Sequence, residues 1–93
     1  MGRWQFDWDE GNRPKCEQRV PVADIEAVFD NRRAIKGQTG TPERWWVVDP
    51  DKRIYLIFTY RKIDGRLRIR VISARFMHAE ELPKWHRRQR RGR

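Results

Sequence analysis

Two runs of β-forming residues joined by Asp64-Gly65 constrain the fold of this chain more than any other feature. Residues 53–61 and 67–75 are rich in aromatic and β-branched residues, which favour strands. An Asp-Gly pair between two such runs is strongly favoured in the two-residue turn of a β-hairpin. The sequence therefore predicts an antiparallel hairpin in which Ile63 pairs with Arg66.

The predicted register gives this hairpin one mainly apolar face. Because the loop has two residues and side chains alternate along a strand, the residues on each face follow from the turn. One face carries six apolar or aromatic side chains, namely Tyr60, Phe58, Leu56, Ile54, Ile69 and Val71. Ser73 and Arg75 are predicted at the far end of the same face. We expect helices to cover this face.

The opposite face of the predicted hairpin gathers arginines. Arg61 is expected across from Arg68, and Thr59 across from Arg70. Like charges facing each other across a strand pair are destabilising, so stability alone gives no reason for this arrangement. Guanidinium groups bind phosphate well through two parallel hydrogen bonds. The cluster therefore predicts an anion site, and the alternative is that carboxylates from elsewhere in the chain neutralise it.

The rest of the chain predicts a small single α+β domain. Alternating apolar residues predict a half-buried strand over 4–9, and residues 44–48 predict a third strand of an antiparallel meander. Proline positions and apolar spacing predict a short helix over 13–19 and a longer one over 21–29. Residues 30–42 are typical of a loop with a short edge strand at 34–35. A helix that ends early or restarts at Pro83 follows residue 75.

Size and charge set the domain boundaries. In a chain of 93 residues we expect one domain over residues 1–86. The basic tail over residues 87–93 is predicted to be disordered. The net charge of +9 favours polyanionic partners, and the first 86 residues still carry +4.

Several function classes are excluded by composition. No apolar run approaches the roughly 20 residues that span a bilayer, and the N-terminus lacks the apolar core of a secretory signal. We therefore expect a cytoplasmic protein without a membrane contact. Cys16 is the only cysteine, so no internal disulfide is possible. Cys16, His78 and His86 lack metal-ligand spacing, and we expect neither a metal nor a cofactor.

Several motifs occur together in the order and spacing of one known family. They are Phe6-Asp7-Trp8-Asp9, Asn12, residues 25–30, Glu43-Arg44, residues 58–61, and residues 68–78 followed by Glu80. Over about residues 4–82 the chain resembles the BrnT family of type II toxins. The resemblance implies a RelE-like ribonuclease fold, in which helices pack on one face of an antiparallel sheet.

The resemblance also implies partners. They are an RNA substrate and a BrnA-type antitoxin, in a heterotetramer of two toxins and two antitoxins that binds operator DNA only through the antitoxin. The chain departs from the family in two places. Residues 17–20 replace a frequent Lys-His-Gly step, so that a basic or imidazole contact is missing there. Residues 83–86 and the arginine tail replace a longer final helix.

RNA cleavage without a metal requires a base, an acid, and cations around the phosphate that the 2′-hydroxyl attacks. We expect Arg61 and Arg70 to grip this phosphate, and Arg75 to contribute from the end of the same strand. An ion pair with Glu80 or another carboxylate is the alternative for Arg75. His78 is the candidate acid or base, because histidine is the residue type that most often takes this role, and a structural role is its alternative.

Further RNA contacts are expected from four residues, namely Arg68, Thr59, Lys15 and Arg44. The sequence thus predicts a metal-independent endoribonuclease toxin that cleaves RNA and blocks translation. The alternatives are a non-catalytic basic module that binds nucleic acid, and a scaffold for an acidic protein. No helix-turn-helix, zinc finger or RNP aromatic motif favours the binding module.

Overall fold

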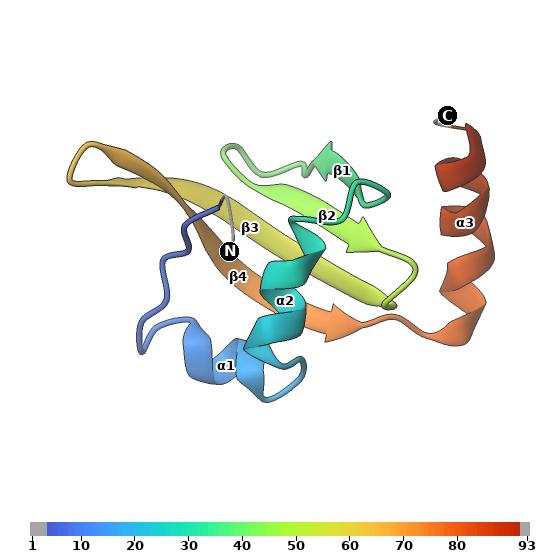
Figure 1. Ribbon diagram of the computed structural model, residues 1–93, viewed down its shortest axis with the longest axis horizontal. Coiled ribbons are helices and arrows are strands. Elements are labelled where there is room, and N and C mark those ends of the chain that lie inside the picture. Colours follow the sequence, from blue (N-terminus) through green and yellow to red (C-terminus); the bar gives the residue numbers. More distant parts are fainter. Residues whose placement is uncertain (1–3, 92–93) are drawn as a thin grey trace.

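Four strands form an antiparallel sheet in the order β1-β2-β3-β4 (Figure 1). Their bounds are Ile35–Gln38 for β1, Trp45–Asp49 for β2, Ile54–Ile63 for β3 and Arg66–Phe76 for β4. The computed structural model describes residues 4–91, which make up a small compact α+β domain. The predicted meander is confirmed. The edge strand expected at 34–35 begins at Ile35 and continues to Gln38, into residues predicted as loop.

The long hairpin of β3 and β4 turns where the sequence predicts. Ile63 pairs with Arg66, and both loop residues have positive φ, 53° at Asp64 and 77° at Gly65. A two-residue turn of this kind requires positive φ at both positions, which Asp-Gly tolerates and most other pairs do not. The predicted pairing of Arg61 with Arg68 and of Thr59 with Arg70 is confirmed.

Beyond these pairs the predicted register is wrong, because a β-bulge shifts β4 by one residue. Phe58 still pairs with Val71, but Ile57 pairs with Ser73 rather than Ile72. The shift places Ala74 beside Leu56 in the core. Arg75, expected beside Ile54, pairs with Tyr55 on the opposite face. The bulge thus keeps a hydroxyl and a guanidinium out of the core, which explains its position.

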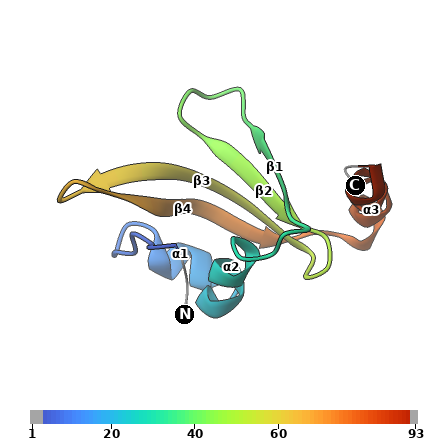
Figure 2. The same ribbon diagram turned by 45° about the horizontal axis from the view of Figure 1, so that its top comes forward.

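Helices α1 (Arg13–Glu17) and α2 (Val22–Val28) cover one face of the sheet, as Figure 2 shows. Their apolar side chains, with those of Val20 and Phe29, pack against the buried residues of the sheet. The sheet contributes seven of these buried residues: Val47, Ile54, Leu56, Phe58, Ile69, Val71 and Ala74. We call the sheet face beneath α1 and α2 the covered face.

The third helix does not follow the expectation that all helices pack on one face. A short 3-10 helix, η1 (Ala79–Glu81), leads into α3 (Leu82–Arg91). On β2, Val47 contacts the core under α1 and α2, whereas its neighbour Val48 packs with Trp85 of α3. Because neighbouring residues of a strand point to opposite faces, α3 packs against the face opposite the covered one.

The predicted disorder of the tail is also wrong for residues 87–91. These residues are helical, and Gln89 among them is 7% exposed. Trp85 and Leu82 pack against the sheet near Trp46 and Val48, so that the helix has an apolar side despite its charge. The domain therefore extends to at least Arg91, and residues 92 and 93 lie outside the described residues.

The N-terminal segment lies along the outer edge of β4, but it is shorter than the strand predicted over 4–9. Phe6 forms a single parallel bridge with Ile69, and the amide of Asp7 donates to the carbonyl of Ile69 at 2.8 Å. Buried Asn12 holds this segment against β4 through three hydrogen bonds. Its side-chain amide donates to the carbonyls of Asp7 and Val71, each at 3.0 Å, and its oxygen accepts from the amide of Asp9 at 2.8 Å.

Candidate nucleic-acid interface

Arg61, Arg68 and Arg70 lie together on the face opposite the covered one, near the turn between β3 and β4, and we call them the arginine cluster. Arg61 and Arg68 are direct cross-strand partners, and Arg70 is the next residue of β4 on the same face. Arg61 is 50% exposed and Arg70 19% exposed at the side chain. Figure 1 shows that the turn end of the hairpin is remote from α3.

Two aspartates partly neutralise the arginine cluster. Asp7 accepts from Arg61 at 2.9 Å and from Arg70 at 3.0 Å, both through Oδ2. Asp9 accepts from both terminal nitrogens of Arg70, each at 3.0 Å. The alternative in which carboxylates meet the arginines is therefore correct for Arg61 and Arg70.

These ion pairs fix the protonation of the groups involved. The hydrogen bond from Arg70, together with that from the amide of Gly11, lowers the pKa of Asp9 below its usual range. The Asp9 and Asp7 carboxylates raise the pKa of Arg70, which burial opposes. At neutral pH Asp9 is thus a carboxylate that can accept a proton but has none to donate.

Arg68 has no carboxylate partner among the described residues. The Nε atom of Arg68 is buried without a hydrogen-bond partner. The Arg68 side chain lines a pocket of about 300 Å³ together with Trp4 and Tyr60. Trp4 is 38% exposed. Aromatic rings beside arginine are the usual platform on which proteins stack single-stranded bases. Ile69, which also lines the pocket, and Tyr60 belong to the covered face, so the pocket lies at the edge of β4 between that face and the arginine cluster.

Arg75 lies on the same face as the arginine cluster but further along β4. It makes two hydrogen bonds to Glu81, at 3.0 and 3.1 Å, and its guanidinium lies 4.7 Å from the centre of the Tyr55 ring. The expected ion pair with a helix carboxylate is present, with Glu81 rather than Glu80. The Arg75 hydrogen bond, helped by the amide of His78, lowers the pKa of Glu81 to about 2.

The four residues predicted to be catalytic do not lie together: Arg61, Arg70, Arg75 and His78. At about 3.3 Å per residue, Arg75 lies roughly 15 Å from Arg70, and His78 lies beyond it. His78 is exposed, and its backbone amide donates to Glu81 at 2.9 Å, which caps η1. The second histidine, His86, belongs to α3. The arginine cluster therefore has no histidine beside it.

The remaining predicted RNA contacts divide between the two sides of the molecule. The hydroxyl of Thr59 donates to the carbonyl of Glu43 at 2.6 Å, so it is already engaged. Arg44 is exposed just before β2. Lys15 is exposed on α1, which covers the other face of the sheet. Of the four residues, only Arg68 and Thr59 adjoin Arg61 and Arg70.

Sequence reasoning missed Asp7 and Asp9 as members of the site. The alternation over residues 4–9 already places both aspartates on one face, opposite Phe6 and Trp8. What the sequence does not show is that this segment lies beside β4 rather than at another edge. The parallel bridge at Phe6 and the hydrogen bonds of Asn12 determine that position.

Other chemistry has little support among residues 4–91. They contain no group of three or more His, Cys, Asp or Glu side chains that could hold a metal ion. Burial raises the pKa of the Cys16 thiol, which makes it a poor nucleophile. No helix in this part of the chain is long and apolar enough to cross a membrane.

Comparison with protein-family models gives no match, and comparison with curated proteins gives no significant match. The likeness to BrnT toxins consequently depends on the motifs quoted from the sequence. It supports a proposal about function together with the geometry of the arginine cluster.

Proposed function

We propose that this protein is a metal-independent endoribonuclease toxin that cleaves RNA at the arginine cluster. The observation that carries the proposal is the convergence of Arg61, Arg68 and Arg70 on a sheet face that neither α1 nor α2 covers. The same residues fall within two of the motifs that resemble the BrnT family, residues 58–61 and residues 68–78. On this proposal the fold is RelE-like and the protein acts in the cytoplasm.

The chemistry needs only the RNA, the protein and water. The 2′-oxygen forms a bond to the adjacent phosphorus, and the bond from phosphorus to the 5′-oxygen breaks. The proton of the 2′-hydroxyl passes to a base, and the leaving 5′-oxygen takes its proton from water. Arg61, Arg68 and Arg70 stabilise the charge on the phosphorane. Asp9 is the candidate base because its exposed carboxylate lies next to Arg70.

The ion pairs leave Arg70 available to a phosphate. The side chain of Asp9 is 51% exposed, whereas that of Asp7 is 12% exposed. Water and salt weaken an ion pair to so exposed a carboxylate, and a phosphate offers Arg70 the same two-oxygen acceptor geometry. A phosphate can therefore replace Asp9 on Arg70 while Asp7 continues to hold the guanidinium in place.

Cleavage of single-stranded RNA in excess chelator tests the proposal. The purified protein is expected to cut the RNA and to leave cyclic or 2′/3′-phosphate ends, because the 2′-oxygen is the nucleophile. The ends are identified by their sensitivity to phosphatase and kinase treatment. Loss of cutting with chelator, or products with 5′-phosphate ends, would rule the mechanism out.

A specific observation favours a second candidate, a nucleic-acid-binding protein that does not cleave. Asp7 and Asp9 occupy Arg70 in the structure, and His78 lies far from the arginine cluster. The same cleavage assay, run beside a gel shift with RNA and with DNA, separates the two functions. Binding without products at any RNA concentration identifies the binding protein.

We also propose that a BrnA-type antitoxin covers the arginine cluster. Two toxins and two antitoxins would form the assembly, and operator DNA would bind only the antitoxin. An acidic segment that contacts Arg61, Arg68 or Arg70 replaces the phosphates of the substrate, so its affinity is expected to fall as salt rises. Calorimetry of the complex at low and high salt measures this. An affinity that salt does not change, with all three arginines still exposed, would show that inhibition occurs from a distant surface.

A further inference from the structure

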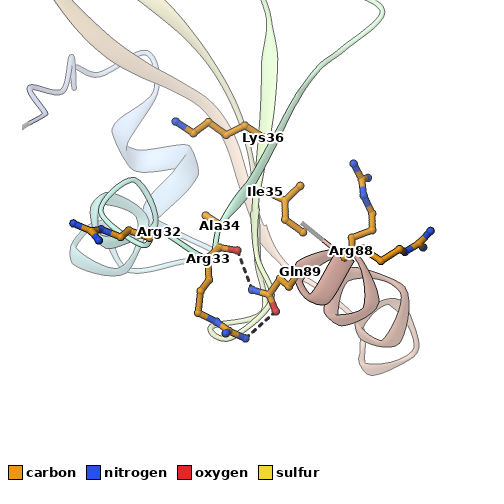
Figure 3. Close-up of a pocket in the computed structure, with 8 residues that line it drawn as sticks. Arg32, Arg33, Ala34, Ile35, Lys36, Arg88 and Gln89 are labelled. Atoms are coloured by element: carbon orange, nitrogen blue, oxygen red, sulfur yellow. Dashed lines mark hydrogen bonds between the residues drawn. The ribbon is translucent and has the colours of Figure 1, made fainter. Parts of the chain in front are cut away.

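A second basic site lies at the other end of the sheet, between β1 and α3. It is a pocket of about 880 Å³ (Figure 3). Five of the residues that line it are cationic, and they come from both walls: Arg32, Arg33, Lys36, Arg88 and Arg91. None of the lining residues is acidic. We call this pocket the basic cleft.

The walls of the basic cleft are fixed by hydrogen bonds. The Gln89 side chain is 7% exposed. It donates to the carbonyl of Arg33 at 2.9 Å and accepts from the guanidinium of Arg33 at 3.3 Å, and Figure 3 shows both bonds crossing from α3 to the segment before β1. A buried amide that bonds both ways holds the two walls at one separation. The cleft is therefore part of the folded structure.

Aromatic rings hold two of its cations in position. The Lys36 ammonium lies 5.7 Å from the centre of the Trp4 ring. The guanidinium of Arg88 lies 5.1 Å from the centre of the Trp85 ring and 5.6 Å from that of Trp46. Such cation–π contacts orient the charge without neutralising it. Arg88 therefore remains able to bind an anion.

The charge of the basic cleft has little internal compensation. Arg33 pairs with Asp51 at 3.1 Å. Among residues 4–91, no carboxylate pairs with Arg32, Lys36, Arg88 or Arg91. By contrast, Arg61 and Arg70 of the arginine cluster both have aspartate partners. The basic cleft is thus the less neutralised of the two sites.

We propose that the basic cleft binds the phosphate chain of single-stranded RNA, as a second contact separate from the arginine cluster. The choice of RNA rests on the proposed function. Figure 3 shows Arg32 and Lys36 extending on one side of β1 and Arg88 on the other, with Ile35 between them. A single phosphate cannot meet cations on both sides, whereas a chain of phosphates that crosses the strand can. Lysines and arginines along such a path bind the backbone without reading its sequence.

The position of the cleft sets the length of RNA that engages it. The domain measures 39 Å along its longest axis, and the arginine cluster and α3 lie towards opposite ends of the sheet (Figure 1). At about 3.4 Å or more per nucleotide, a strand of about 4 nucleotides reaches only one site, whereas one of about 12 or more can span the 39 Å of the domain. Only the longer strand should therefore engage the cleft and the arginine cluster together.

The test measures binding of a 2′-O-methyl RNA of about 16 nucleotides, a length at the upper end of single-strand binding sites. This RNA has no free 2′-hydroxyl and so cannot be cut. Arg88→Gln with Arg91→Gln, and separately Arg32→Gln with Lys36→Gln, remove two charges from either wall. For each pair, the slope of log affinity against log salt should become shallower by about 1.4, from about 0.7 per lost contact. An oligonucleotide of about 4 nucleotides cannot reach both sites, so the native protein should bind it with a shallower slope than it binds the long probe.

Arg87→Gln with Arg90→Gln is the matched control, because both arginines are exposed on α3 and neither lines the cleft. If this control lowers the slope as much as the cleft variants, the effect is general attraction and the proposal is wrong. It is also wrong if the native protein does not bind the long probe, or if only inorganic phosphate binds the cleft. Binding without cleavage of ordinary RNA would refute the ribonuclease and leave the cleft standing.

Discussion

Arg70→Gln is expected to slow RNA cleavage by about 10²- to 10³-fold, the usual cost of removing one donor that stabilises transition-state charge. Arg70 is the best placed of the three arginines because Asp7 and Asp9 both hold its guanidinium. Glutamine keeps a hydrogen-bond donor for one aspartate but loses the positive charge and the fork of nitrogens that matches a phosphate. Single-turnover cleavage rates, compared with the native protein in the same chelator, measure the effect.

Lys62→Gln is the matched control for this variant. Lys62 is exposed on the same hairpin, and its pairing with Leu67 places it on the other face of the sheet. The same charge is removed, so general attraction of RNA falls equally, but the phosphate at the arginine cluster keeps its contacts. Thermal unfolding of both variants confirms that they are folded. Equal cleavage rates for Arg70→Gln and the native protein would remove the arginine cluster from the mechanism.

The hairpin could be predicted from sequence because its turn is local. Asp64 and Gly65 both need positive φ, and no other pair in the chain offers this between two β-rich runs. The bulge at Ile57 and Phe58 could not be predicted in the same way, because the turn chemistry fixes only the register next to it. It follows from the need to keep Ser73 and Arg75 away from the core under α1 and α2.

The candidate site was predictable only where it lies within one hairpin. The arginine cluster follows from the turn at residues 64 and 65, but its aspartates come from a segment about 60 residues away in the chain. The position of Asp7 and Asp9 beside Arg70 depends on two tertiary contacts, the bridge at Phe6 and the hydrogen bond from buried Asn12 to β4. The basic cleft was missed for a similar reason. A run of arginines is typical of a disordered tail unless an apolar side, here Leu82 and Trp85, packs against the sheet.

Trp85→Ala should lower the free energy of unfolding by about 3 kcal/mol, at the lower end of the range for removing a large buried aromatic side chain. Trp85 is 7% exposed, and its ring centre lies 5.3 Å from that of Trp46. A helix of ten residues is marginal alone in water, and this one carries arginines at four of its last five positions. Packing of Trp85 must therefore provide much of what holds α3 on the sheet. Urea denaturation followed by circular dichroism measures the loss.

Arg87→Ala is the control on the same helix, since Arg87 is exposed and its removal should change stability by no more than about 0.5 kcal/mol. Hydrogen exchange of α3 distinguishes global from local loss. If Trp85→Ala leaves the denaturation midpoint unchanged while the α3 amides exchange freely, the helix unfolds by itself and the sheet is stable without it. In either case the walls of the basic cleft separate. The slope of log affinity against log salt for long RNA should therefore be as shallow for Trp85→Ala as for Arg88→Gln with Arg91→Gln. Unchanged stability, exchange and salt dependence together would show that Trp85 does not hold α3 in place.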